Sequence, residues 1–173
     1  KKLIKKIILK SNLINDKYLK KSLSFLLKKR ITIKKAIFSS VVPSIYKLIK
    51  FYLLKNLKVK CFEIKQLKIN KLIKILVNRK QIGSDRLCNA IGVNDNKNNY
   101  IIVDFGTATT FDVITKDGNY NGGVIAPGVN LSIKSLSISA DQIPVFSLKK
   151  QGKIIGKNTI EALRSGFYCG YSG

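Results

Sequence analysis

The sequence YIIVDFGTATTFD, residues 100–112, determines how the rest of the chain is interpreted. An apolar run over residues 100–103 is followed by Asp104, Gly106 and three threonines. This order predicts a buried strand that delivers polar groups to a tight turn. A second strand over residues 109–114 would return as the other arm of a hairpin.

The side chains of this turn suit a phosphate or cation site. Asp104 ends an apolar strand, where an unpaired carboxylate is costly to bury, so we expect it to face a cation or a cleft. Gly106 lets the backbone approach a ligand closely because it lacks a Cβ. Thr107, Thr109 and Thr110 supply hydroxyls without adding negative charge. The same residues also suit an ordinary hairpin turn, and short glycine-containing motifs often match by chance, so both interpretations stay open.

The positive charge of the chain is unevenly distributed. The net charge is +24, yet residues 1–80 hold 24 Lys and Arg against 2 Asp and Glu, whereas residues 81–173 hold 9 against 7. Strongly basic chains often bind nucleic acid or anionic membranes. Here the lysines alternate with Ile and Leu, which indicates solvated faces of helices and strands. We therefore expect no nucleic-acid partner, since an aromatic-basic motif of the RNA-binding kind is also missing from the sequence.

Residue types that the sequence lacks narrow its chemistry. There is no His, which excludes Ser-His-Asp triads and His-ligated zinc within these 173 residues. Cys61, Cys88 and Cys169 have no metal-ligand spacing, which predicts buried free thiols in a reducing compartment. No uninterrupted apolar run reaches the length of a membrane span, so we expect a cytoplasmic protein without a membrane partner.

Apolar periodicity along the first half alternates between helix and strand. Asn15 and Asp16 predict the start of a helix that runs to about residue 29. Residues 33–42 are strand-like, Pro43 would open a helix over residues 44–54, and a strand over residues 59–64 follows. The first ten residues suit either a helix or a strand. The alternation predicts an α/β fold.

Three further stretches contain glycine beside polar residues. Gly-Ser-Asp-Arg, residues 83–86, precedes a predicted helix over residues 87–93, where Asp85 could be a helix cap or a general base. GGVIAPG, residues 122–128, marks a backbone that passes close to another group, with a helix from about residue 130. GKNT, residues 156–159, precedes a predicted helix over residues 160–171, whose small residues would allow a close helix contact or the close approach of a ligand.

In their order and separations, the motifs SSVVP, GSDR, VDFGTATTFDV, GGVIAPG and GKNTIEALRSG resemble the type III pantothenate kinases. The resemblance runs from about residue 33 to residue 173. It implies an α/β fold of the actin-like ATPase and sugar-kinase superfamily, with two ribonuclease-H-like halves and a cleft between them. Residues 1–98 would be the remainder of the first half and residues 99–173 the start of the second. The resemblance also implies a homodimer.

The implied reaction transfers the γ-phosphoryl group of ATP to the terminal hydroxyl of pantothenate, the first step towards coenzyme A. Asp85 matches the family's proton acceptor for that hydroxyl. Gly83, Ser84 and Arg86 complete with Asp85 the loop that contacts pantothenate, and Thr159 matches a second pantothenate contact.

The resemblance places the ATP side of the site at the hairpin. Asp104 corresponds to the ligand of a monovalent cation, K⁺ or NH₄⁺, and Thr107 to an ATP contact, with Mg²⁺ accompanying the nucleotide. Phosphoryl transfer asks a protein mainly to position groups and to neutralise charge, so these groups suffice without His.

The sequence departs from the family at several points. Nothing in residues 1–35 matches the Asp-Ile-Gly-Asn-Thr type loop that grips the ATP phosphates, and the family continues beyond residue 173. We therefore expect an internal fragment, truncated at both ends and inactive alone. Leu76 stands where a substrate-touching Tyr is usual, and Ser84 stands where Ala is usual.

Two hypotheses from other classes remain open. The first is a non-catalytic relative that binds a regulatory partner, although a pure binding module has no need for a base such as Asp85. The second is a basic surface that binds nucleic acid or anionic lipid, which steeply salt-dependent binding would reveal.

Overall fold

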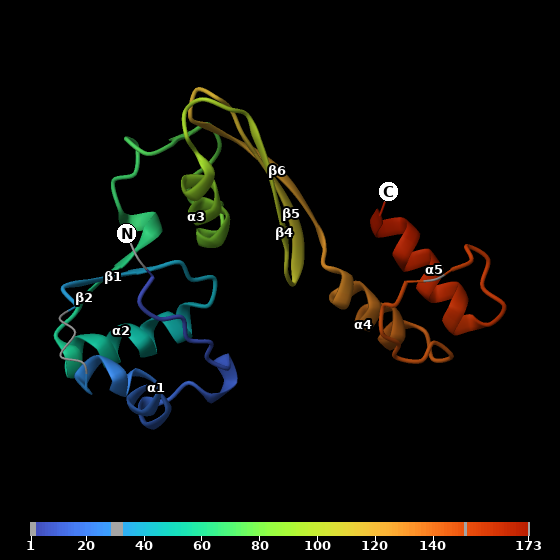
Figure 1. Cartoon of the computed structure of the whole chain (residues 1–173), viewed down its shortest axis with the longest axis horizontal. Helices are drawn as coiled ribbons and strands as arrows, with labels where there is room; N and C mark the ends of the chain where they lie inside the picture. Colours follow the sequence, from blue (N-terminus) through green and yellow to red (C-terminus); the bar gives the residue numbers. More distant parts are fainter. Residues whose placement is uncertain (1–2, 29–32, 151, 173) are drawn as a thin grey trace. The chain divides into compact units, whose positions relative to one another are not determined.

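The computed structural model describes residues 3–28, 33–150 and 152–172 (Figure 1). The chain divides into two compact units, Lys1–Asn94 and Asp95–Gly173. Both units contain helices and strands, and parallel as well as antiparallel strand pairs occur. The predicted α/β class is therefore confirmed.

A parallel strand pair and its crossover helix form the centre of the first unit. Strands β1 (Lys35–Phe38) and β2 (Lys60–Glu63) pair in parallel, with Ala36 opposite Cys61, and helix α2 (Pro43–Leu57) connects them. Parallel neighbours need such a crossover, because a tight turn can join only antiparallel strands. The buried apolar side chains described in this unit are Leu19, Leu26, Tyr52, Val59, Ile64, Ile69, Ile73, Ile82, Leu87 and Ala90.

The predicted starts of the first two α-helices are confirmed. Helix α1 (Asp16–Lys28) begins beside Asn15, whose Oδ1 accepts a hydrogen bond from the backbone N–H of Tyr18 at 2.9 Å. Such a bond satisfies one of the free amides at a helix start. Pro43 opens α2, as expected for a residue whose fixed φ suits the first helical position. The predicted end of α1 at residue 29 lies outside the described residues.

Two parts of this unit differ from the expected strands: one strand is shorter than predicted, and the first residues form no strand. The strand expected over residues 33–42 is only four residues long, because Ser40 forms a local turn in which its Oγ accepts from Val42 N at 3.2 Å. Residues 3–10 form neither a helix nor a strand and lead into the short helix η1 (Ser11–Leu13).

The cysteines are free, but Cys61 and Cys88 are only half-buried and Cys169 is exposed, so the prediction of buried thiols was wrong.

The remainder of the first unit leads to helix α3. Helix η2 (Ile64–Gln66) and strand β3 (Lys74–Ile75) come first, and α3 (Ser84–Val93) begins three residues before its predicted start. Leu87 and Ala90 are fully buried and define the inner face of α3. The side chain of Asn94 fixes the other end of α3, since its Nδ2 donates to the carbonyl of Leu72 at 2.8 Å.

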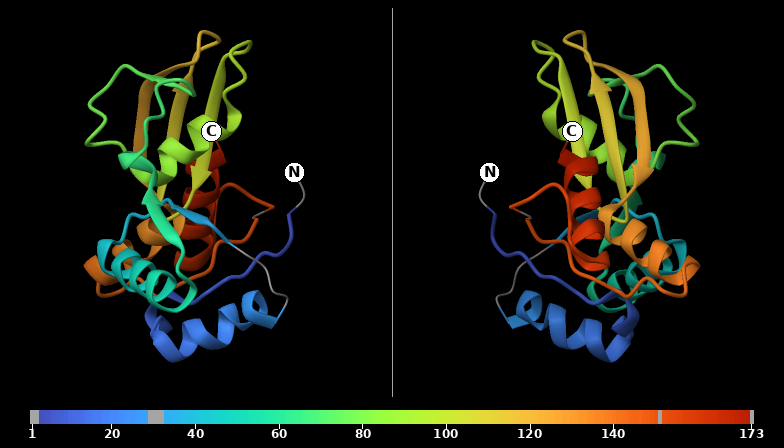
Figure 2. Two further views of the ribbon diagram at one scale, coloured as in Figure 1. Left: turned by 90° about the vertical axis from the view of Figure 1, so that its left-hand side faces the viewer. Right: turned by 90° about the vertical axis from the view of Figure 1, so that its right-hand side faces the viewer.

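The second unit contributes three neighbouring antiparallel strands to a sheet, and Figure 2 shows them side by side. The strands are β4 (Tyr100–Phe105), β5 (Ala108–Ile114) and β6 (Asn119–Pro127). The predicted hairpin is confirmed, with Asp104 opposite Thr110 across β4 and β5. Strand β6 is longer than expected because its two glycines lie inside it, where Gly122 has a φ of 99°.

Two helices follow the sheet in the second unit. Helix α4 (Val129–Ser139) comes directly after β6, and α5 (Thr159–Ser172) closes the described part of the chain. The rings of Phe146 and Phe167 pack edge to face with centroids 5.5 Å apart. Arg164 Nε donates to the carbonyl of Ser147 at 3.1 Å, so the irregular segment between α4 and α5 is held against α5 by packing and by a hydrogen bond.

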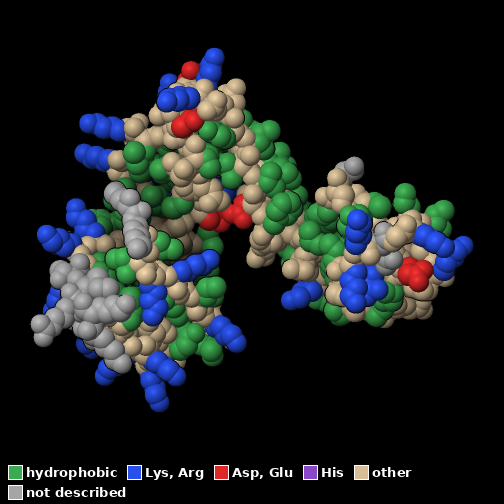
Figure 3. Space-filling view, in the orientation of Figure 1, with side chains coloured by type: hydrophobic (Ala, Val, Ile, Leu, Met, Phe, Trp, Pro, Cys, Tyr) green, Lys and Arg blue, Asp and Glu red, His purple; other side chains and the backbone are tan. Residues whose placement is uncertain are grey.

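The basic residues of the first unit project outward at many separate points of the face that Figure 3 displays. Apolar side chains lie between them, as expected for solvated faces of helices. Among the described residues, no helix combines the length and the apolar character needed to cross a membrane.

A titration of Asp95 tests the loop that opens the second unit. Hydrogen bonds from Tyr100 and Asn98 and the amide of Lys97 hold the pKa of Asp95 well below its usual value, and the Tyr100 bond has the largest effect. The Asp95 carboxylate therefore stabilises the fold above its unfolded pKa, and this contribution is lost as the pH falls towards the folded pKa. We expect Tyr100→Phe to raise the pKa of Asp95, measured by NMR, and Tyr168→Phe to leave it unchanged. An unaltered pKa in Tyr100→Phe would contradict this account.

Candidate functional site

The first turn of α3 carries the Gly-Ser-Asp-Arg motif. Gly83 is the N-cap and no side chain caps the helix, so the alternative in which Asp85 is a helix cap is wrong. Asp85 lies inside the first turn, where its exposed carboxylate accepts a hydrogen bond from the backbone N–H of Arg86 at 2.8 Å. Negative charge is favourable at this end of a helix. The carboxylate is thus oriented by its own helix and remains accessible.

Ser84 faces the protein rather than the solvent. Only 2% of its surface is exposed, and its hydroxyl donates to Glu63 Oε1 at 2.5 Å. The hydroxyl is therefore engaged inside the first unit. A substrate contact at Ser84, as the sequence predicts, would have to use the backbone.

The turn between β4 and β5 carries the second predicted group. Asp104 is half-buried near the end of β4, and Thr107 is exposed in the turn itself. Thr109 is 3% exposed, and within the described part of the chain the hydroxyls of Thr109 and Thr110 have no hydrogen-bond partner. Successive residues of a strand point to opposite faces, so these two hydroxyls lie on different sides of the sheet.

The turn is held in place by the end of β6. The backbone N–H of Gly128 donates to the carbonyl of Thr107 at 3.0 Å, and the N–H of Gly106 donates to the carbonyl of Ala108 at 3.0 Å. A Cβ on residue 128 would overlap the carbonyl oxygens of Gly106 and Thr107. The expectation that GGVIAPG passes close to another group is confirmed, and that group is the β4–β5 turn.

A hydrogen-bonded loop presents Thr159 at the start of α5. Asn158 Oδ1 accepts from the backbone N–H of Glu161 at 2.9 Å, and Glu161 Oε2 accepts from the N–H of Lys157 at 2.8 Å. This arrangement is close to a capping box, in which two side chains satisfy the free amides of a helix start. A Cβ on Gly156 would overlap the backbone of α5 at residues 161 and 162. Thr159 is therefore exposed on a firmly held backbone.

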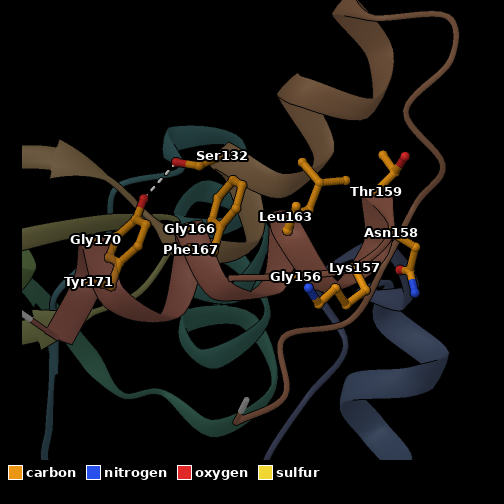
Figure 4. Close-up of a pocket in the computed structure, with 11 residues that line it drawn as sticks. Ser132, Gly156, Lys157, Asn158, Thr159, Leu163, Gly166, Phe167, Gly170 and Tyr171 are labelled. Carbon is orange, nitrogen blue, oxygen red and sulfur yellow. Dashed lines mark hydrogen bonds between the residues drawn. The ribbon is translucent and has the colours of Figure 1, made fainter. Parts of the chain in front are cut away.

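An open groove of about 900 Å³ runs along α5 (Figure 4). The small residues Ala162, Gly166 and Gly170 line it, as the sequence suggested, with Ser132 from α4. The hydroxyls of Ser132 and Tyr171 share a hydrogen bond of 2.7 Å. The sequence gives no sign of this pair, because no local pattern links residues that are 39 positions apart.

The donors of the β4–β5 turn fit cations that prefer oxygen. Over the described residues, no group of three His, Cys, Asp or Glu side chains could hold a metal ion. Asp104 and the hydroxyl of Thr107 are hard oxygen donors. They suit an oxygen-binding cation whose remaining ligands are phosphate oxygens and water.

The structure distributes the predicted site residues over both units. The residues Gly83, Ser84, Asp85 and Arg86 lie together at the start of α3 in the first unit, and Asp104, Thr107 and Thr159 belong to the second. Within the second unit, Asp104 and Thr107 share the β4–β5 hairpin, while Thr159 begins α5.

The sequence model of the type III pantothenate kinase family matches residues 4–173. The chain belongs to the type III pantothenate kinase family. A relative named type III pantothenate kinase from Pelagibacter ubique is 54% identical over 171 residues, which cover 99% of this chain and 68% of that protein. Membership thus covers nearly all of the chain, including both units.

More distant type III pantothenate kinases match over shorter stretches. The Rhodospirillum rubrum relative is 48% identical over 103 residues, covering 58% of this chain and 40% of that protein. The Paramagnetospirillum magneticum relative is 38% identical and covers 83% of this chain and 56% of that protein. The chain therefore spans only part of the length of the type III pantothenate kinases that it matches.

One solved structure supports the fold. A Baf family protein from Campylobacter jejuni superimposes with a TM-score of 0.56 at 20% sequence identity, over 87% of this chain and 66% of that chain. At this identity the likeness concerns the fold alone.

Replacing Gly128 tests the contact that supports the β4–β5 turn. We expect Gly128→Ala to lower the free energy of unfolding by about 1–3 kcal/mol, because the added methyl group meets backbone that cannot rotate away. The matched control is Gly92→Ala on α3, where nothing lies within 4 Å of the new Cβ. There the gain in helix propensity should stabilise the fold by about 0.5–1 kcal/mol. Urea unfolding measures both changes, and equal effects would contradict the close approach.

Proposed function

We propose that the protein containing this chain transfers the γ-phosphoryl group of ATP to pantothenate and so forms 4'-phosphopantothenate, the first step of coenzyme A biosynthesis. The observation that carries the proposal is the 54% identity to the Pelagibacter ubique relative over 99% of the chain. The polar groups at α3, the β4–β5 turn and α5 are of the kinds that phosphoryl transfer needs.

Asp85 is proposed as the group that accepts the proton of the pantothenate hydroxyl. A general base must be able to reach the proton that it removes, and the Asp85 carboxylate is exposed at the start of a helix. Its hydrogen bond to the Arg86 amide limits its rotation. Asp85 therefore combines access with a restricted orientation.

The remaining pantothenate contacts are proposed at Gly83, Ser84, Arg86 and Thr159. Pantothenate carries a carboxylate, and a guanidinium such as that of Arg86 binds carboxylates with two parallel hydrogen bonds. The buried hydroxyl of Ser84 leaves only its backbone for substrate. Thr159 offers an exposed hydroxyl from the capped start of α5.

ATP is proposed to bind at the β4–β5 turn. Gly106 leaves the turn backbone open to close approach, and Thr107 offers an exposed hydroxyl. Asp104 would hold a monovalent cation, K⁺ or NH₄⁺, and Mg²⁺ would be held mainly by the phosphates. Bound cations neutralise charge on the transferring phosphoryl group. The protein's own part is to fix the turn, which Gly128 does from the end of β6.

We also propose the fold, the oligomeric state and the cellular location of the enzyme. The two units would belong to the two ribonuclease-H-like halves of an actin-like ATPase fold, and the enzyme would be a homodimer in the cytoplasm. The mixed strand pairs and the superposition with the Baf family protein support this architecture. The three free cysteines support a reducing compartment.

Replacing Asp85 tests the proposed base. In the full-length protein, assayed with ATP, Mg²⁺ and K⁺, we expect Asp85→Asn to lower the turnover of pantothenate by at least about 100-fold, since general base catalysis contributes this much. Pantothenate binding, followed by calorimetry, should persist because the amide keeps the size of the side chain. A coupled assay for ADP measures the turnover.

Asp141→Asn is the matched control, because Asp141 is an exposed carboxylate in the segment after α4. It should keep the turnover of the original protein. Equal turnover in both variants would contradict the role of Asp85. A full-length protein that binds a partner but never phosphorylates pantothenate would favour the regulatory alternative.

A further inference from the structure

Glu63 is one of only two acidic residues in the basic first 80 residues, the other being Asp16. Both of its carboxylate oxygens are engaged within the chain. Oε2 accepts from the backbone N–H of Lys65 at 2.7 Å, and Oε1 accepts from the hydroxyl of Ser84 at 2.5 Å. The carboxylate is therefore fixed at both oxygens.

The two bonds connect elements that are distant in sequence. Glu63 is the N-cap of η2, and Ser84, 21 residues later, is the first residue of α3. The Ser84 hydroxyl is almost fully buried, so water cannot easily replace Glu63 as its acceptor. Hydrogen bonds to an ionised acceptor are stronger than neutral ones, and removing one partner of a buried pair leaves the other unsatisfied.

Arg79 makes a second contact that holds η2. Arg79 Nη2 donates to the carbonyls of Lys65 and Leu67 at 2.9 and 2.6 Å. The η2 turn and its N-cap Glu63 are thus hydrogen-bonded both to Arg79 and to the first turn of α3. Because Asp85 and Arg86 follow Ser84 directly, the bond from Glu63 sets the place from which their side chains extend.

We propose that Glu63 is a positioning residue, which acts through Ser84 to orient Asp85 and Arg86 for the phosphorylation of pantothenate. This inference rests on the proposed function. Glu63 touches neither substrate nor nucleotide in this account. Glu63 instead fixes the conformation of the first turn of α3 before the substrate binds.

The test uses Glu63→Gln, Ser84→Ala and the double variant in the full-length protein. We expect Glu63→Gln to lower kcat/KM for pantothenate about tenfold, because a small misplacement of catalytic groups is costly. The KM for pantothenate should rise and the KM for ATP should not change. A merely structural defect would instead lower the active fraction and leave both KM values unchanged. The double variant should lose no more than Glu63→Gln, since the two residues act as one unit.

Ser137→Ala is the matched control. It removes a half-buried hydroxyl that donates to the carbonyls of Ile133 and Pro144 at 3.1 and 3.3 Å, neither of which is a proposed site residue. Both KM values should stay as in the original protein. Strictly additive effects of Glu63→Gln and Ser84→Ala, or a pantothenate KM unchanged in Glu63→Gln, would overturn the positioning role.

Amide hydrogen exchange gives a readout that needs no kinase activity. Residues 84–87 should exchange faster in Glu63→Gln than in the original protein, and at the original rate in Ser137→Ala. Unaltered exchange in Glu63→Gln would overturn the inference while leaving the proposed function intact. Faster exchange in a protein that never phosphorylates pantothenate would support the positioning of α3 and overturn the proposed function.

Discussion

The second unit depends on the close approach of Gly128, the N-cap of α4, to the β4–β5 turn. Its N–H donates to the carbonyl of Thr107, and no side chain fits between this residue and the β4–β5 turn. The contact turns a hairpin tip, which would otherwise be mobile, into a backbone with a fixed conformation. Phosphoryl transfer relies on donors that are already in place, because reorganising them during the reaction would consume binding energy. A fixed turn therefore suits the nucleotide role that we propose for it.

The same arrangement recurs at the other two groups of predicted residues. Thr159 is exposed, but the loop before it packs so closely on α5 that Gly156 admits no side chain. Asp85 is exposed, but the residue before it is buried and bonded to Glu63. In each case an accessible polar side chain follows a residue whose freedom is removed by packing or by a hydrogen bond. Because the neighbouring residue is fixed, the polar side chain can be exposed without its backbone becoming mobile.

Sequence patterns predicted the features that have a local cause. The hairpin over residues 100–114 follows from apolar alternation around a glycine turn, and α2 starts at Pro43 because of the fixed φ of proline. The strand before α2 was predicted too long, since the turn at Ser40 competes with strand pairing. The roles of Glu63 and Tyr171 could not be predicted, because their partners lie 21 and 39 positions away and no periodicity encodes them. The substrate and cation roles of the site residues come from family resemblance and stay predictions.

The most direct test of the account is an NMR titration of the full-length protein, labelled at backbone amides, with ATP and Mg²⁺ and then with pantothenate. We predict that ATP shifts the amides of Gly106, Thr107 and Gly128, and that pantothenate shifts those of Asp85 and Arg86. ATP shifts confined to other parts of the protein would contradict the central claim that the turn supported by Gly128 binds the nucleotide.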